Sequence, residues 1–116
     1  MRLDTPDKGT EGVARYSHLH GFLPRLGFFV GHEDRIPVDF HEVLALIAPR
    51  PVLVLAPELD RDSTLADVKL AVERARAIYR LQGKPDNLTL HAPFDYNRLS
   101  LPSQNWALDW MRKTLP

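Results

Sequence analysis

Asp60 is the residue of this chain best placed for acid–base chemistry, because it follows an apolar run, Val52–Leu55, that is typical of a buried strand. A carboxylate on the turn after such a strand can orient a histidine through its Nδ1 hydrogen and stabilise the imidazolium. The alternative is that Asp60 and Asp62 only begin a turn and favour the positive N-terminus of the following helix. The residue types alone leave both roles open.

The next apolar stretch, 87–91, is also predicted to be a strand, and a histidine near its end could partner this acid. Asn97 follows in the loop after that strand, but an amide cannot take a proton from a serine hydroxyl at neutral pH. His91 is the remaining candidate base on this side of the sheet, six residues earlier. Its alternative role is to end the strand with its ring packed or in water.

The loop after His91 contains Asp95, Tyr96, Asn97 and Arg98, a set rich in hydrogen-bond donors and acceptors with one aromatic ring. Ligands of open α/β sheets bind at the carboxyl ends of the strands, so this loop could bind a carbohydrate or a carboxylate. The simpler interpretation is an Asx-type turn in which Arg98 pairs with a surface acid.

Nucleophiles and metal ligands are poorly represented. No G-x-S-x-G motif occurs, and no serine is flanked by the small residues that a nucleophile elbow needs; the serines are Ser17, Ser63, Ser100 and Ser103. The histidine-rich N-terminal third lacks any recognised metal-ligand spacing, and its candidates are His18, His20, His32, Glu33, Asp34 and His41. The chain has no cysteine. We therefore expect neither a metal nor a cofactor.

The elements that would position these residues can be predicted from periodicity and capping. A first helix should begin after Asp39, with Glu42 completing a capping box, and end at Pro49. A second should span about 64–82, capped by Ser63 or Thr64 and ended by Gly83. Its apolar stripe is Leu65, Val68, Val72, Ala75 and Tyr79.

A last helix is predicted at about 103–114, after a loop at 92–100. Strand, helix and strand in this order predict a parallel βαβ unit followed by one helix, an α/β protein. Residues 22–31 are predicted to form a short buried strand or an extended segment, and residues 1–21 a mobile N-terminal segment.

Residues 22–113 resemble the C-terminal part of a bacterial α/β-hydrolase of the acetyl-xylan-esterase and dienelactone-hydrolase type. The resemblance rests on Pro24–Phe29, Asp39–Glu42, Ala48–Leu53, Leu59–Asp62 and Asp95–Arg98. It implies that residues 22–116 are a partial α/β-hydrolase domain, with Asp60 as the orienting acid and Asn97 at the place where the family has its histidine base. It also implies that the serine elbow, the oxyanion hole and most of the sheet belong to segments N-terminal to residue 22.

The composition of the chain limits the kinds of partner that it is expected to bind. With 116 residues, 15 Lys plus Arg and 15 Asp plus Glu, the chain is one neutral domain at most, and it has no electrostatic case for nucleic acid or membrane. No apolar signal-peptide region is present at Met1–Gly12, so a cytoplasmic location is the expectation. A short apolar parallel sheet leaves open edges, which predicts a homo-oligomer.

The sequence thus favours a truncated, esterase-like fragment that self-associates and whose own catalysis is in question. If it is an enzyme, it is a carboxylic ester hydrolase using Asp60 and His91, with the serine supplied by a partner chain. The alternative function is a non-catalytic binding or assembly module that uses the loop from Asp95 to Arg98.

Overall fold

The computed structural model describes residues 24–29, 32–61 and 63–114. The chain divides into two compact units, Met1–Phe40 and His41–Pro116. The predicted mobile segment 1–21, and with it His18 and His20, lies outside the described residues.

The described part of the first unit consists of two short 3-10 helices, η2 (Pro24–Phe29) and η3 (Glu33–Arg35). The prediction of a buried strand or extended segment at 22–31 is therefore wrong for Pro24–Phe29, and the rest of that stretch lies outside the described residues. Proline fixes φ near the helical value and is favoured at the first position of a helix, which suits Pro24 to begin η2. Phe28 is exposed and Phe29 is half-buried, so neither of these two aromatic side chains is fully buried.

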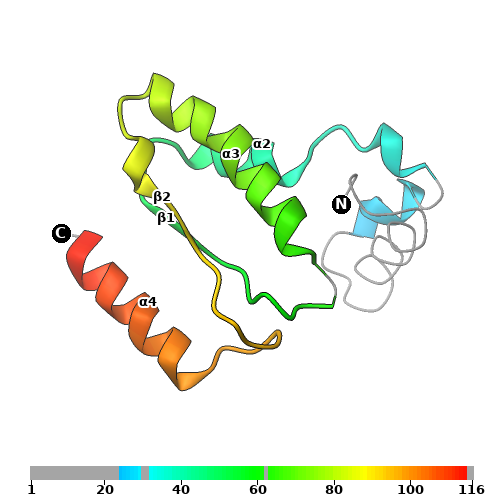
Figure 1. Cartoon of the computed structure of the whole chain (residues 1–116). Helices are drawn as coiled ribbons and strands as arrows, with labels where there is room; N and C mark the ends of the chain where they lie inside the picture. Colours follow the sequence, from blue (N-terminus) through cyan, green and yellow to red (C-terminus); the bar gives the residue numbers. More distant parts are fainter. Residues whose placement is uncertain (1–23, 30–31, 62, 115–116) are drawn as a thin grey trace. The chain divides into compact units, whose positions relative to one another are not determined.

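The second unit contains the predicted α/β elements (Figure 1). Helix α2 spans Phe40–Ile47, strand β1 Val52–Leu55, helix α3 Leu65–Leu81, the 3-10 helix η4 Pro85–Asn87, strand β2 Leu88–His91 and helix α4 Leu101–Thr114. The two strands are parallel, with Val52 opposite Leu88 and Leu55 opposite His91. The predicted βαβ unit and the α/β class are confirmed.

The ends of α3 follow the predicted capping. Before α2, Asp39 Oδ1 accepts a hydrogen bond from the adjacent Phe40 N–H at 2.8 Å, and the capping box of Asp39 with Glu42 stays a prediction. Thr64 is the N-cap of α3, and its hydroxyl oxygen accepts from the Asp67 N–H. Gly83 has φ +69°, the left-handed conformation that glycine adopts without steric cost after a helix.

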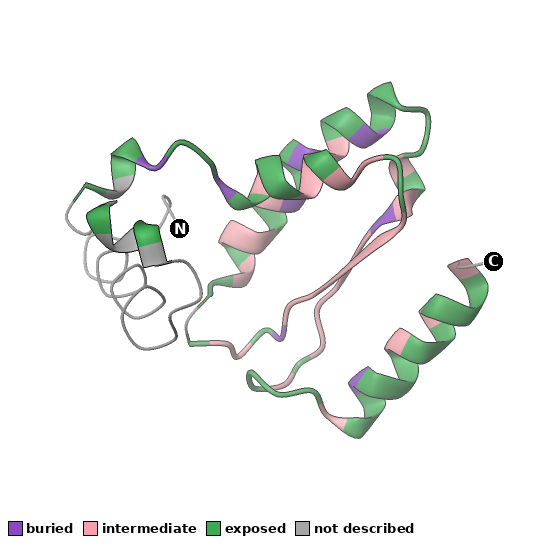
Figure 2. Ribbon diagram, turned by 180° about the vertical axis from the view of Figure 1, so that it is seen from behind, coloured by how far each residue is buried: buried purple, intermediate pink, exposed green. Residues whose placement is uncertain are grey.

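The sheet separates two layers of side chains. On one face, the fully buried Val72, Ala75 and Tyr79 of α3 pack with Leu88, and with half-buried residues that include Val52, Val54 and Leu90. On the other face, α4 reaches the sheet through two tryptophans: Trp110 Nε1 donates to Thr89 Oγ1 at 3.1 Å, and Trp106 stacks on His91. Figure 2 shows purple, buried positions on α3 and a largely green, exposed α4.

Strand β1 is less covered than its sequence predicts. All four residues, Val52–Leu55, are half-buried rather than buried on both faces. The physical reason is the size of the sheet, because among the described residues it has only two strands and each keeps one open edge.

The turn between α2 and β1 is held by hydrogen bonds from residues that are distant in sequence. Its Ala48–Pro49 peptide bond is cis. The Tyr79 hydroxyl donates to the Arg50 carbonyl at 3.1 Å, and Asn87 Nδ2 donates to the Pro49 carbonyl at 2.6 Å. The Ala-Pro-Arg-Pro segment is therefore tied to both α3 and η4, which fixes where β1 begins.

Candidate functional site

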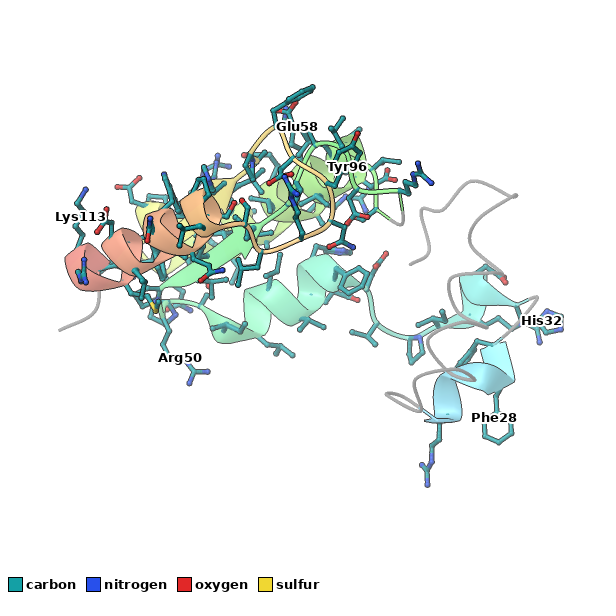
Figure 3. The ribbon with its side chains drawn as sticks, turned by 90° about the horizontal axis from the view of Figure 1, so that it is seen from below. Phe28, His32, Arg50, Glu58, Tyr96 and Lys113 are labelled. Carbon is teal, nitrogen blue, oxygen red and sulfur yellow. The ribbon has the colours of Figure 1, made fainter. Side chains whose placement is uncertain are left out.

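The loops that follow β1 and β2 lie side by side at the carboxyl edge of the sheet. Their backbones are joined by three hydrogen bonds, from Ala56 N–H to the His91 carbonyl (2.9 Å), Glu58 N–H to Pro93 (3.0 Å) and Leu59 N–H to Asp95 (3.0 Å). Figure 3 shows Glu58 and Tyr96 at this end of the sheet and Arg50 at the other. The topology thus brings the loop of Asp60 and the loop of Asp95–Arg98 to one edge.

Asp60 occupies the end of the first of these loops and is half-buried. Its N–H donates to the Pro57 carbonyl at 3.2 Å, which closes a tight turn directly after β1. The cap of α3 is Thr64, so the structure does not need Asp60 for that purpose. This placement is compatible with the predicted orienting acid and with the turn interpretation.

His91 ends β2, and its ring is packed. It stacks on the Trp106 indole with ring centroids 3.9 Å apart and planes 2° from parallel. Among the described residues, its ring nitrogens have no hydrogen-bond partner. The ring of His91 is therefore packed at the end of the strand, as the alternative role predicted, and it lies on the face of the sheet that α4 covers. The sequence has no signal for the stacking of Trp106 on His91, because no local pattern links a helix residue to a strand end fifteen positions earlier.

The loop from Asp95 to Arg98 is an Asx-type turn with an internal ion pair. Asp95 Oδ1 accepts from the Tyr96 N–H and from Arg98 Nε, both at 2.8 Å. The Asp95 side chain is 13% exposed and that of Arg98 66%. Arg98 thus pairs with an acid of its own loop, and its guanidinium otherwise faces solvent. Asn97 is exposed in the same loop.

The Asp95 carboxylate also accepts from the Ser100 hydroxyl. Burial on its own would raise the pKa of Asp95, but the hydrogen bonds from Tyr96, Ser100 and Arg98 and the Arg98 charge outweigh it and lower that pKa below its ordinary value. Ser100 Oγ in turn lies 3.1 Å from Oγ of the buried Ser103. A carboxylate with a lowered pKa is a weak base, so it does not activate either serine as a nucleophile.

We expect Arg98→Met to raise the pKa of Asp95 towards the value of an ordinary aspartate, because the substitution removes one hydrogen bond and one positive charge. A carboxyl-carbon NMR titration of both proteins measures this directly. A carboxylate with a lowered folded-state pKa stabilises the fold above its unfolded pKa, and this contribution is lost as the pH falls through the folded value. An unchanged Asp95 titration in the variant would contradict the proposed cause.

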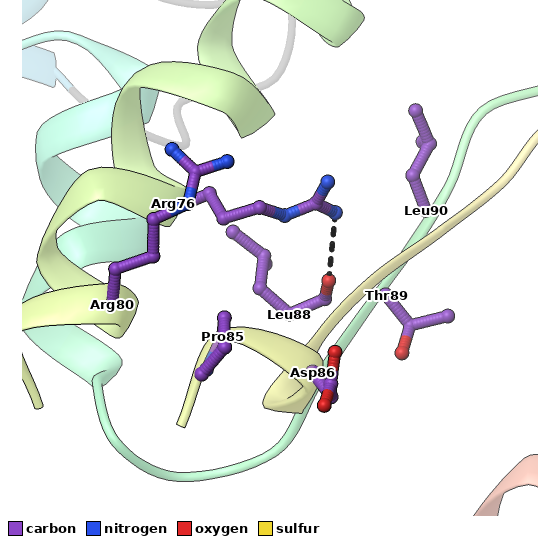
Figure 4. A pocket seen from close by; sticks show the side chains of 7 residues that line it. All are labelled: Arg76, Arg80, Pro85, Asp86, Leu88, Thr89 and Leu90. Carbon is purple, nitrogen blue, oxygen red and sulfur yellow. Dashed lines mark hydrogen bonds between the residues drawn. The ribbon is translucent and has the colours of Figure 1, made fainter. Parts of the chain in front are cut away.

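Among the described residues, a further hollow of about 450 Å³ lies along β2 from Leu88 to Leu90 (Figure 4). It is lined by Arg76, Arg80, Pro85, Asp86, Leu88, Thr89 and Leu90. Its two guanidinium groups are already occupied, since Arg76 pairs with Glu73 at 2.7 Å and Arg80 with the same carboxylate at 3.5 Å. Leu88 begins β2, so this hollow lies at the opposite end of the strand from the joined loops.

The described residues can be searched for a metal site and for a membrane-spanning helix. No group of three or more His, Asp or Glu side chains there could hold a metal ion, and this includes His32 and His41. Nor is any described helix long and apolar enough to cross a membrane.

The comparisons with known proteins now define the class. Residues 9–83 match the sequence model of the fungal glucuronyl esterases. A 67-residue stretch is 38% identical to Carbohydrate esterase MZ0003 from an unknown prokaryotic organism, covering 58% of this chain and 16% of that protein. The matched stretch, which includes β1, the loop of Asp60 and α3, is thus esterase-related, and the chain belongs to the glucuronyl esterase family.

The predicted resemblance is confirmed at the level of esterases, whereas the narrower acetyl-xylan-esterase and dienelactone-hydrolase type receives no support. The chain aligns with about one sixth of the length of the relative it matches. The family match includes Asp60 and ends at Gly83, before β2 and the loop that carries Asp95–Arg98.

Proposed function

We propose that this chain is a segment of an α/β-hydrolase fold for carbohydrate esters, that it contributes the acid-bearing loop with Asp60, and that it does not hydrolyse esters by itself. The observation that carries this proposal is the joined pair of loops at the carboxyl edge, with Asp60 on one and no general base on the other. The name of the family, glucuronyl esterase, implies an ester of glucuronic acid as substrate.

Catalysis by serine needs a nucleophile, a base within hydrogen-bond reach and an acid that orients the base. Of these, the chain offers an acid in Asp60. His91 has one ring face covered by Trp106, and Asn97 cannot act as a base. If activity exists, Asp60 would be the orienting acid, His91 or another histidine the base, and a partner chain would supply the serine and the oxyanion donors.

We expect the unmodified chain, Asp60→Asn and Asp86→Asn to hydrolyse p-nitrophenyl acetate and a benzyl ester of glucuronic acid at the same rate, that of buffer. Asp86 is the matched control, because it is exposed beside the hollow at the other end of β2. Turnover by the unmodified chain and by Asp86→Asn that is lost in Asp60→Asn would show a complete site and contradict the proposal.

A second candidate function is binding of a uronic acid without turnover. Arg98 favours it, because Asp95 holds the guanidinium through Nε while the rest of the group is exposed. Two large side chains of the same loop, Phe94 and Tyr96, are 79% and 60% exposed and could stack against a sugar ring. Free glucuronate would then raise the melting temperature of the chain but not of Arg98→Met. Equal melting in both proteins with and without glucuronate would exclude this role.

A further inference from the structure

The two open edges of the sheet are not equivalent. The direction of each backbone group follows from the hydrogen bond between Ala56 N–H and the His91 carbonyl, which crosses from one strand to the other. Backbone groups alternate in direction along a strand. The N–H and C=O groups of Val52, Val54 and Ala56 therefore point towards β2, while those of Leu53 and Leu55 point away from it, in the plane of the sheet. On β2, the His91 carbonyl points towards β1, so the backbone groups of Leu88 and Leu90 point away from β1, to the outer edge.

The outer edge of β2 is protected. The outward carbonyl of Leu88 accepts a hydrogen bond from Arg76 Nη2 at 3.0 Å, which places a guanidinium across this edge (Figure 4). Arg80 and Asp86 line the same side of the strand. Charged side chains on an edge strand discourage pairing with another chain. This edge therefore resembles the natural end of a sheet.

The outer edge of β1 has no such protection among the described residues. The stretch Pro51–Pro57 contains no charged residue, and its strand residues are half-buried and apolar. Its outward-facing positions are Pro51, Leu53, Leu55 and Pro57. Proline has no N–H, so donors for a new strand exist only at Leu53 and Leu55.

The residues whose backbone groups point outwards are arranged symmetrically about Val54. In chain order they are a proline, a leucine, a leucine and a proline. When two copies pair antiparallel across a two-fold axis at Val54, Leu53 of each copy exchanges both hydrogen bonds with Leu55 of the other. The positions that lack a donor then face each other, Pro51 opposite Pro57, so neither copy leaves an N–H without a partner. The Pro57 carbonyl already accepts from Asp60 within its own turn.

We propose that β1 is the assembly edge of this protein and that its occupant is a second copy of the chain, paired antiparallel about Val54. The four-stranded sheet then has the order β2-β1-β1-β2, with the Arg76-protected edges outermost. A closed two-fold contact of this kind uses the same surface on both copies and stops at the dimer. The neutral net charge of the chain adds no repulsion between copies.

The absence of cysteine from the sequence allows a direct test with Val54→Cys. At the two-fold axis the two residues form a non-hydrogen-bonded pair, with Cα atoms about 4.5 Å apart, which suits a disulfide. Val52→Cys is the matched control on the same face of the same strand. In the proposed register its two copies lie about 13 Å apart, too far to be bridged.

With oxidised glutathione as the oxidant, which is itself reduced to the thiol, we expect most of Val54→Cys to become a covalent dimer on non-reducing gels. We expect Val52→Cys to remain a single chain, and the unsubstituted protein to sediment as a dimer. A monodisperse unsubstituted monomer would overturn the proposal, whether another segment or another partner covers the edge. A dimer in which both variants cross-link equally, or neither does, would overturn the proposed register.

Discussion

Replacing Tyr79 with alanine is expected to lower the free energy of unfolding by about 3–5 kcal/mol, the range typical of a large buried aromatic side chain. Tyr79 is fully buried and belongs to the core cluster of α3 and the strands. Its hydroxyl also holds the Arg50 carbonyl. The loss combines a cavity in the core with an unsatisfied carbonyl at the start of β1. Urea unfolding of both proteins, followed by circular dichroism, measures the difference.

Tyr79→Phe is the matched control, since it keeps the ring and removes only the hydroxyl. We expect a cost of about 1 kcal/mol for the lost hydrogen bond. Burial raises the pKa of Tyr79, while the Arg50 charge opposes the rise. The neutral phenol thus stabilises the fold below the unfolded pKa of about 10, and this contribution is lost as the pH rises through the folded value. Equal stabilities for the alanine and phenylalanine variants would show that packing of the ring is unimportant.

The second large effect is expected for Leu88→Ala, at about 2–5 kcal/mol. Leu88 is 2% exposed, packs in the core cluster and begins β2. Leu90→Ala, on the same strand and facing the same helix layer, is the matched control, because Leu90 is only half-buried and should cost less. The midpoints of urea unfolding rank the two variants. A larger loss for Leu90 would mean that the core is centred nearer the carboxyl edge.

The regular elements of the second unit could be predicted because their signals are local. The apolar stripe of α3, its Thr64 cap and the Gly83 stop all lie within one helix. The strand Val52–Leu55 lies between two prolines and has no polar alternation. Periodicity and capping act over a few residues, so they can be read without knowing the neighbours in space.

What could not be predicted depends on contacts distant in sequence or on missing neighbours. The stretch at 22–31 has no period, and its aromatic residues suggested burial where the structure has a 3-10 helix with Phe28 exposed. The degree of burial of β1 depends on how many strands flank it. Of the candidate site, the sequence identified the two loops, but not the bonds that join them or the stacking of Trp106 on His91.

The bonds from Tyr79 and Asn87 to the turn at Pro49–Arg50 set a minimum length for any piece of this protein that keeps the turn in place. Any piece that keeps both bonds must run at least from Pro49 to Asn87, and it therefore includes β1, all of α3 and η4. The family match ends at Gly83, four residues before Asn87. The stretch that matches the family and the stretch that holds the turn in place consequently have different boundaries. A dissection of the protein guided by similarity alone would cut away the side chain that anchors its most recognisable turn.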